Sequence, residues 1–218
     1  MIDPVVQAFR GEYRRTSIGP RYKGWLHFAT TSVGSLLVIA FAAIHLKAVR
    51  PLEWLTIPAT FLLANFIEYH GHRGPMHHPV RGLSLLFRRH TREHHRYFTH
   101  EAMTCESSRD FKMILFPPVM LLFFLGVIAT PLGTALFVLV SPNVGWLYVT
   151  VAMTYFLTYE WLHFAYHLDP SSPIGRLPLL GRLRRHHAAH HDPALMTRGN
   201  FNITFPICDR LYGTTTGR

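Results

Sequence analysis

Charged residues are scarce in this chain of 218 residues, and acidic residues are the scarcer kind. Only 16% of the residues are charged, against about a quarter in ordinary soluble domains. Asp and Glu number 12 against 22 Lys and Arg, which gives a net charge of +10. Apolar residues make up 49% and lie in long blocks, so the composition excludes a disordered chain and predicts a membrane protein.

Cysteine is almost absent, and so are the short motifs of several enzyme classes. Cys105 and Cys208 make neither a disulfide framework nor the CxxC spacing of a thiolate metal site. No HExxH sequence occurs, which argues against a zinc protease. The chain also lacks GxGxxG and CxxCH, the motifs for a nucleotide cofactor or an attached haem. Electrons for a redox reaction must therefore come from a partner.

Four apolar runs divide the chain and predict two helical hairpins in a membrane. The first run is just long enough for one crossing, and a tight turn near Arg50 leads into the second. The third run is longer than one crossing needs, and Pro117, Pro118 and Pro131 predict kinks or a broken helix within it. The runs are Leu26–Leu46, Leu52–Tyr69, Met113–Val140 and Trp146–Leu162.

The distribution of basic residues predicts the orientation of these hairpins in the membrane. Of the 22 Lys and Arg, 20 lie outside the turn of the first hairpin, at both chain ends and between the hairpins. By the positive-inside rule we expect both termini and the histidine-rich segments on the cytoplasmic face, with anionic lipid and not nucleic acid as the partner. Residues 1–25 are polar, so no cleavable signal peptide is expected. The sequence predicts one all-α membrane-embedded domain, a four-helix bundle with a cytoplasmic helical cap, divided into residues 1–25, 26–69, 70–112, 113–162 and 163–218.

Histidine is the residue that the chain has in excess, with 16 copies. Eight lie between His70 and His100 and six between His163 and His191, which leaves two isolated histidines that we expect to be packing or interfacial residues. Spacings of three and four residues bring imidazoles to one side of a helix. Three of the four groups have such spacings: His90 with His94 and His95; His163 with His167; and His187 with His190 and His191. The fourth group is His72 with His77, which are five residues apart.

Ten imidazoles in four groups predict two metal ions, because one metal takes at most about six ligands. Structural zinc prefers four ligands and catalytic zinc three, calcium and magnesium prefer oxygen, and blue copper needs a cysteine. Iron accepts imidazole together with water and can perform oxygen chemistry. Two irons beside a bilayer would face the C–H bonds of lipids. The alternative without a metal is a basic histidine surface that meets phosphate head groups.

The histidine groups resemble those of the fatty acid hydroxylase/sterol desaturase superfamily of membrane di-iron oxygenases. The resemblance covers roughly residues 60–215 and includes EYHGHR at Glu68–Arg73 and NFNITFPICDRLYGT at Asn200–Thr214. It implies a monooxygenase that hydroxylates a C–H bond of a membrane lipid, fatty acyl or sterol-like, with O₂. By the resemblance the metal ligands are His72, His77, His90, His94, His95, His163, His167, His187, His190 and His191.

The same resemblance implies the cofactors and partners. Two irons form the centre, zinc can replace them in a purified sample, and no catalytic residue is implied beyond the metal ligands. Electrons would come from a separate ferredoxin-like or b-type-cytochrome-like donor with its reductase. The same site would serve a desaturase or a carotenoid hydroxylase, and the mass of the product separates hydroxylation from desaturation. A non-catalytic metal-binding or transport protein is disfavoured, because the apolar runs contain few polar residues.

Some histidines have alternative assignments. His78 and His186 adjoin assigned ligands, so a shift of one residue would exchange them. The spacing between His90 and His94 is one residue longer than in many family members. The alternative role for His90 is therefore to support a ligand histidine without binding the metal itself. His70 and His100 match no motif position and are expected to be supporting or surface residues.

Carboxylates next to the histidine groups are expected to orient ligand imidazoles. Glu68 and Glu160 each lie one helical turn before a ligand histidine, and Asp192 directly follows the last group. For the two glutamates the alternative is pairing with the surrounding arginines. Asn200 and Asp209 are expected to order the C-terminal backbone over the site.

Overall fold

The computed structural model describes residues 2–217, which form helices and loops and, within that range, no β-strand. The all-α prediction is therefore confirmed for these residues. The chain divides into a first compact unit, made of Met1–Trp25, Asn65–Leu115 and Trp161–Arg218, and a second unit, made of Leu26–Ala64 and Phe116–Glu160.

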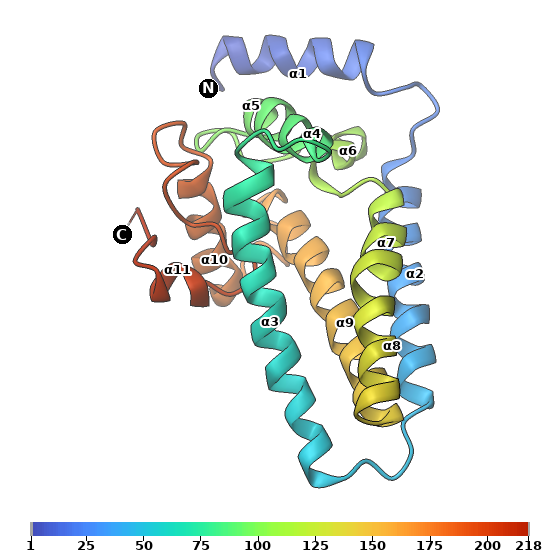
Figure 1. Cartoon of the computed structure of the whole chain (residues 1–218). Helices are drawn as coiled ribbons and strands as arrows, with labels where there is room; N and C mark the ends of the chain where they lie inside the picture. Colours follow the sequence, from blue (N-terminus) through green and yellow to red (C-terminus); the bar gives the residue numbers. More distant parts are fainter. Residues whose placement is uncertain (1, 218) are drawn as a thin grey trace. The chain divides into compact units, whose positions relative to one another are not determined.

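In chain order (Figure 1) the helices are α1 (Pro4–Thr16), α2 (Gly24–Ile44), η1 (Pro51–Leu55), α3 (Thr56–Gly71), η2 (His72–Met76), α4 (Ser84–Phe87), η3 (Arg88–His94), α5 (His95–Tyr97), η4 (Ser108–Asp110), α6 (Phe111–Ile114), α7 (Val119–Phe123), η5 (Phe124–Ala129), α8 (Thr130–Leu139), α9 (Pro142–Tyr166), α10 (Pro178–His190) and α11 (Ile207–Leu211).

Two helical stretches are long and apolar enough to cross a membrane. Gly24–Ile44 has 21 residues with a mean hydropathy of 1.7, and Ser108–Leu139 has 32 residues with a mean hydropathy of 2.3. The second stretch is broken as predicted, because α6 ends before Pro117 and a π-helical turn, η5, joins α7 to α8. These stretches support a membrane protein, while four crossings and a cytoplasmic cap remain predictions.

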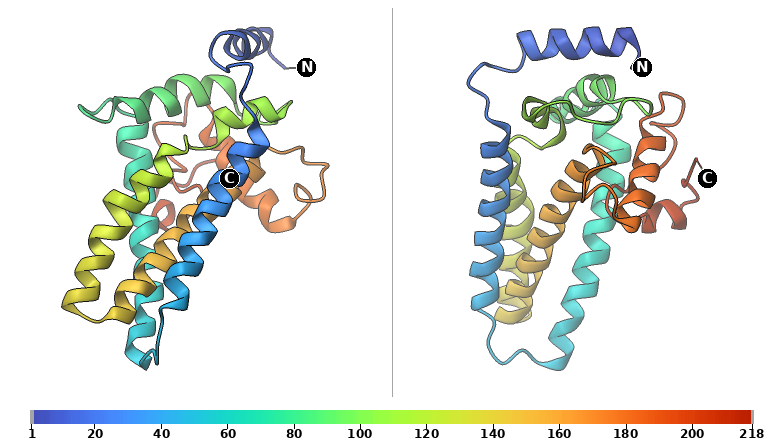
Figure 2. Two further views of the ribbon diagram at one scale, coloured as in Figure 1. Left: turned by 90° about the vertical axis from the view of Figure 1, so that its right-hand side faces the viewer. Right: turned by 180° about the vertical axis from the view of Figure 1, so that it is seen from behind.

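In the second unit, α2, α8 and α9 run side by side (Figure 2). The helices α8 and α9 approach closely because small residues face each other. A Cβ atom on Gly145 would lie 2.6 Å from the Cβ of Phe137 and 2.7 Å from the carbonyl oxygen of Gly133. Leu37 and Val138 are 65% and 72% exposed, so large apolar side chains face outward, as they do on a surface that contacts lipid.

In the first unit, α1 packs on α5 (Figure 1). Helix α1 begins where Asp3 accepts a hydrogen bond from the N–H of Val5, and Pro4 occupies its first turn. Tyr13 of α1 contacts Tyr97 of α5, with ring centroids 6.0 Å apart. All ten predicted ligand histidines belong to this unit, so the candidate site can be described within it.

Candidate metal centre

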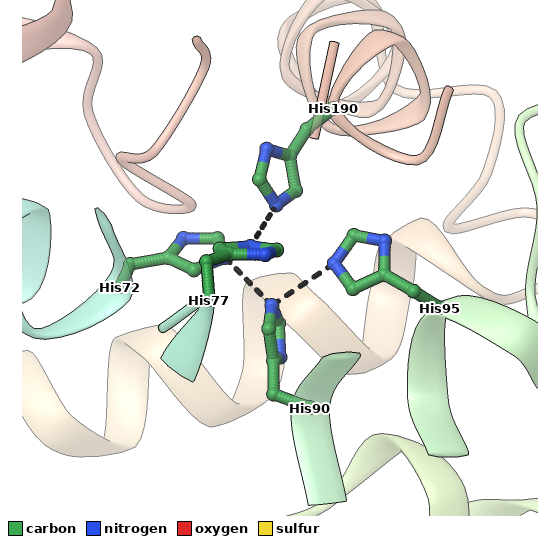
Figure 3. A group of neighbouring side chains, drawn as sticks. All are labelled: His72, His77, His90, His95 and His190. Carbon is green, nitrogen blue, oxygen red and sulfur yellow. Dashed lines mark hydrogen bonds between the residues drawn. The ribbon is translucent and has the colours of Figure 1, made fainter. Parts of the chain in front are cut away.

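The ten predicted ligands come together in two groups, and each of them is at most 6% exposed. Nine of them form two sets, one of five and one of four, in which one nitrogen from each histidine lies within 4.8 Å of every other, and His191 is in neither set. His191 Nε2 lies 3.2 Å from His94 Nε2 and 3.1 Å from His187 Nε2, so His191 belongs with the second group. The first histidine group is His72, His77, His90, His95 and His190 (Figure 3). The second is His94, His163, His167 and His187, together with His191 through its contacts to His94 and His187.

Two π-helical turns bring histidines five residues apart into the same group. In η2 and η3 the hydrogen bonds run from i to i+5, so residues with that spacing lie about one turn apart. His72 with His77, and His90 with His95, have this spacing and share the first histidine group. Since His90 contributes its Nε2 to this group, the geometry favours a ligand position over a supporting one.

The three histidines of α10 divide between the groups. His187 and His191 are four residues apart and belong to the second histidine group, while His190 belongs to the first. All three are buried, as expected for residues on one inward-facing side of a helix. A single short helix therefore supplies imidazoles to both groups.

Five of these ten imidazoles are fixed by a main-chain carbonyl at Nδ1. Because a carbonyl oxygen can only accept a hydrogen bond, an Nδ1 that bonds to one carries the proton and leaves the lone pair on Nε2. The Nδ1 donors and their carbonyl acceptors are His72 and Phe201 (2.5 Å), His190 and Gly199 (2.9 Å), His94 and Met113 (2.7 Å), His167 and Met103 (2.7 Å), and His191 and Phe98 (2.5 Å).

The Nε2 atoms then face one another at distances where two lone pairs repel. His94 and His191 both donate from Nδ1, yet their Nε2 atoms lie 3.2 Å apart. The Nε2 atoms of His77 and His190 lie 3.0 Å apart. His77 Nδ1 donates to Thr91 Oγ1, whose own hydrogen goes to a main-chain carbonyl. A cation between the lone pairs removes this repulsion, so the geometry fits a metal ion in each group.

The spacing, protonation and donor type of the groups fit a transition metal. Imidazole nitrogens at about 2.0–2.1 Å from a metal lie at most about 4 Å apart, close to the 4.8 Å spread found here. Burial, followed by the imidazole of His190, lowers the pKa of His77 to about 2. Burial and neighbouring imidazoles also hold the pKa values of His72 and His90 well below 6.5. Neutral imidazole is the form that binds metal, and an all-nitrogen set suits iron or zinc better than calcium or magnesium.

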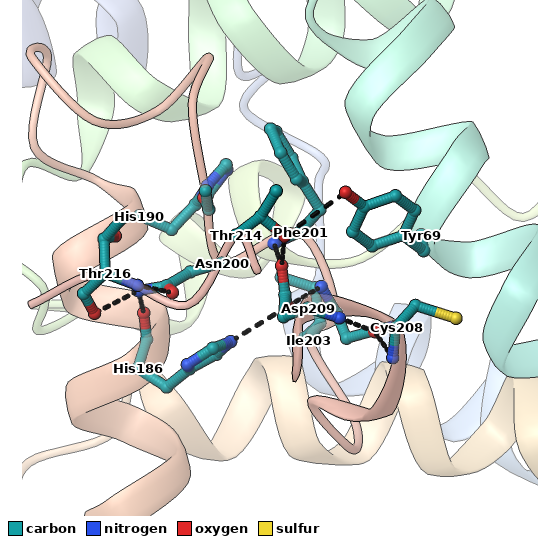
Figure 4. A network of polar contacts seen from close by, with 12 residues as sticks. Tyr69, His186, His190, Asn200, Phe201, Ile203, Cys208, Asp209, Thr214 and Thr216 are labelled. Carbon is teal, nitrogen blue, oxygen red and sulfur yellow. Dashed lines mark hydrogen bonds and ion pairs between the residues drawn. The ribbon is translucent and has the colours of Figure 1, made fainter. Parts of the chain in front are cut away.

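The C-terminal loop, residues 199–205, carries two of the carbonyl acceptors (Figure 4). Asn200 lies between Gly199 and Phe201 and has a φ of 59°, a conformation that asparagine adopts more readily than most residues. The carboxylate of Asp209 accepts hydrogen bonds from the N–H groups of Phe201 (2.9 Å) and Asn202 (2.8 Å). The prediction that Asn200 and Asp209 order this backbone is confirmed.

The carboxylates predicted to orient imidazoles have other partners. Glu68 accepts hydrogen bonds from the main chain of the C-terminal loop, including the N–H of Thr204 at 2.9 Å. Both nitrogens of His72 contact other atoms, so the prediction for Glu68 is wrong. Glu160 and Asp192 likewise accept main-chain N–H groups. The physical reason is that carbonyl oxygens already take the Nδ1 hydrogens.

The remaining histidines of the two clusters along the sequence lie outside both groups. His70, His78 and His100 are exposed. His186 is mostly buried, and its Nε2 lies 3.2 Å from Asp209 Oδ2. The exchange of His78 or His186 with a neighbouring ligand is therefore not supported.

An all-helical chain with apolar helices and two groups of buried histidines defines a class: membrane proteins whose histidines could hold a pair of metal ions. The model of the fatty acid hydroxylase family matches residues 57–214. The chain belongs to this family of oxidoreductases, as its histidine motifs predicted.

Known proteins show the same relationship. Two rice (Oryza sativa subsp. indica) proteins, the very-long-chain aldehyde decarbonylases GL1-8 and GL1-11, are each 31% identical over 80% of this chain. The chain spans 59% of the length of each. The hydroxylase domain of scs7p superposes with a TM-score of 0.63 at 21% identity, over 87% of this chain and 67% of that one. The last likeness concerns the fold alone.

Proposed function

We propose that the two histidine groups hold two iron ions and that the protein is an integral-membrane oxidoreductase that oxidises a lipid chain with O₂. The observation that carries this proposal is the convergence of unprotonated Nε2 atoms in two buried groups. When bound, the two irons supply the activation of O₂ that attack on an unactivated C–H bond requires. The ten histidines given above are the proposed ligands.

The protein's own part is to hold the ligands still and neutral. The carbonyls of Phe201 and Met103 fix the proton on Nδ1 of His72 and His167, which keeps each Nε2 free for metal. Burial disfavours protonation of the imidazoles, so the ligand set stays uncharged near neutral pH. Burial also limits access of water to the site.

We propose four membrane crossings, with both termini and the histidine groups on the cytoplasmic side. The second unit contains only Lys47 and Arg50 among the 22 Lys and Arg, which supports this orientation by the positive-inside rule. Outward-facing apolar side chains on α2 and α8 support contact with lipid. Iron would receive its electrons from a separate donor protein, ferredoxin-like or similar to a b-type cytochrome, because the sequence contains no motif for a second redox cofactor.

Two reactions have specific support. The match to the fatty acid hydroxylase family favours hydroxylation of a fatty acyl or sterol-like chain. The likeness to two very-long-chain aldehyde decarbonylases favours a long-chain aldehyde as the alternative substrate. Under this proposal both reactions would take place at the two histidine groups.

Lipid profiles of cells grown under isotopically heavy O₂ test the proposal. We expect cells with the wild-type protein to accumulate a lipid that is heavier by one labelled oxygen atom, and cells with His167→Ala to lack it, since a buried ligand is lost. Loss of a long-chain aldehyde would indicate the alternative reaction. His78→Ala, which changes an exposed histidine outside both groups, is the matched control and should retain full activity. Full turnover by His167→Ala would contradict the proposed site.

A further inference from the structure

We infer that Arg10, on the N-terminal helix α1, is a positioning residue for the second histidine group. This inference rests on the proposed function, because it assumes that each group holds an ion. Helix α1 carries no histidine and lies outside residues 57–214, the part of the chain that matches the family. Helix α1 would therefore support the metal site although it contains no metal ligand.

The guanidinium of Arg10 is fully buried against one loop. It donates from Nε to the carbonyl oxygen of Tyr97 at 2.7 Å, from Nη2 to that of Ala102 at 2.5 Å, and from Nη1 to that of Thr104 at 3.3 Å. Nη1 also lies 2.9 Å from Glu106 Oε1, which compensates the buried charge. The planar, five-donor fork of arginine is suited to binding several carbonyls at once. Residues 97–106 are called the anchor loop from here on.

The anchor loop also holds two histidines of the second group. Phe98 accepts a hydrogen bond from His191 Nδ1 at 2.5 Å, and Met103 accepts one from His167 Nδ1 at 2.7 Å. The N–H of Cys105 donates to the carbonyl oxygen of His167 at 2.8 Å. Each of these three contacts comes from a residue directly next to one whose carbonyl Arg10 binds. Movement of the carbonyls bound by Arg10 would therefore move the atoms that fix the imidazoles.

Three of the five imidazoles in the first histidine group are fixed outside the anchor loop. His72 and His190 donate to carbonyls of the C-terminal loop, and His77 donates to Thr91. The C-terminal loop is in turn held by Glu68. Loss of Arg10 should therefore weaken metal binding at the second group and spare the first. A general loss of stability would weaken both.

Co²⁺ titration of the purified full-length protein, with elemental analysis, tests this selectivity. We expect the wild type to bind two Co²⁺ per chain, and Arg10→Met to weaken one of them by about 10- to 100-fold, the usual effect of losing a group that orients a metal ligand. Arg15→Met is the matched control: Arg15 lies on the same helix, is 75% exposed and pairs with Glu12, so its loss should change neither affinity.

Double variants identify which ion is affected. His77→Ala removes a ligand of the first group, and His163→Ala removes one of the second. Arg10→Met should weaken the remaining ion by the same 10- to 100-fold in the His77→Ala background and should change nothing in the His163→Ala background. Arg10→Lys keeps the charge but loses the fork, so it should weaken the same ion less, and it carries the test if Arg10→Met does not fold.

Two results separate the inference from the proposed function. Equal weakening of both ions, or unchanged affinities in Arg10→Met and Arg10→Lys, would overturn the positioning role. If the wild type still binds two Co²⁺, the proposed metal centre is unaffected by that result. A wild-type protein that binds no Co²⁺ would overturn the proposed function itself.

Discussion

Five of the ten imidazoles in the two groups have an Nδ1 atom that donates to a main-chain carbonyl. Main-chain carbonyls fix both the orientation of the ring and the position of its proton, so the side chain arrives with Nε2 free. Such acceptors have no signature in a sequence, because every residue has a carbonyl. The histidines themselves were predictable, since neutral imidazole carries the ligand chemistry in the residue type.

Asn200 shows how a single residue presents two of these carbonyls. Its φ of 59° costs most side chains about 1–2 kcal/mol, but glycine adopts it freely. Its amide also bonds to the main chain of Thr216 and His186. We expect Asn200→Gly and Asn200→Ala both to lower the free energy of unfolding, and the alanine variant to be less stable by about 1 kcal/mol. Denaturant unfolding in detergent measures both, and an alanine variant as stable as the glycine variant would contradict the strain argument.

At the scale of the elements, the order of the helices could be predicted from the sequence, but the π-helical turns could not. The chain order of apolar and histidine-rich segments, and the break near Pro117, followed from composition and proline chemistry. The pairing of His90 with His95 did not, because the spacing of the motif was interpreted with α-helical periodicity. The role predicted for Glu68 was wrong for a related reason: spacing along one helix does not reveal a loop that arrives from residue 199 onward.

Thr91 links the two π-helical turns and gives an element-scale prediction. Its hydroxyl donates to the carbonyl oxygen of Met76 at 2.7 Å and accepts from His77 Nδ1 at 3.1 Å. Thr91→Val keeps the shape of the side chain but leaves the carbonyl of Met76 and the Nδ1–H of His77 without a partner. This should cost about 1–3 kcal/mol of unfolding free energy and weaken Co²⁺ binding at the first histidine group about tenfold. Thr154→Val is the control, since Thr154 is exposed and bonds only within its own helix. Unchanged Co²⁺ affinity in Thr91→Val would refute the link.

On the scale of the whole molecule, charge and chemistry are concentrated in the same unit. The first unit contains 20 of the 22 Lys and Arg and all ten proposed ligand histidines, whereas the second unit is apolar. The ten imidazoles are buried and neutral, so without a cation their lone pairs oppose one another. Metal should therefore stabilise the folded chain as a whole, and not only complete a reaction centre.

Removal of the metal tests this dependence. At a free concentration of about 100 times its dissociation constant, each bound ion adds about 2.7 kcal/mol to the free energy of unfolding. Two ions should thus raise the melting temperature of a chain of this size by about 10 °C or more. We expect a chelator to lower the melting temperature by that amount and Fe²⁺ or Zn²⁺ to restore it. Mg²⁺, which prefers oxygen ligands, should not restore it. An unchanged melting temperature in protein that elemental analysis shows to be stripped would mean that the histidine groups are stable without metal.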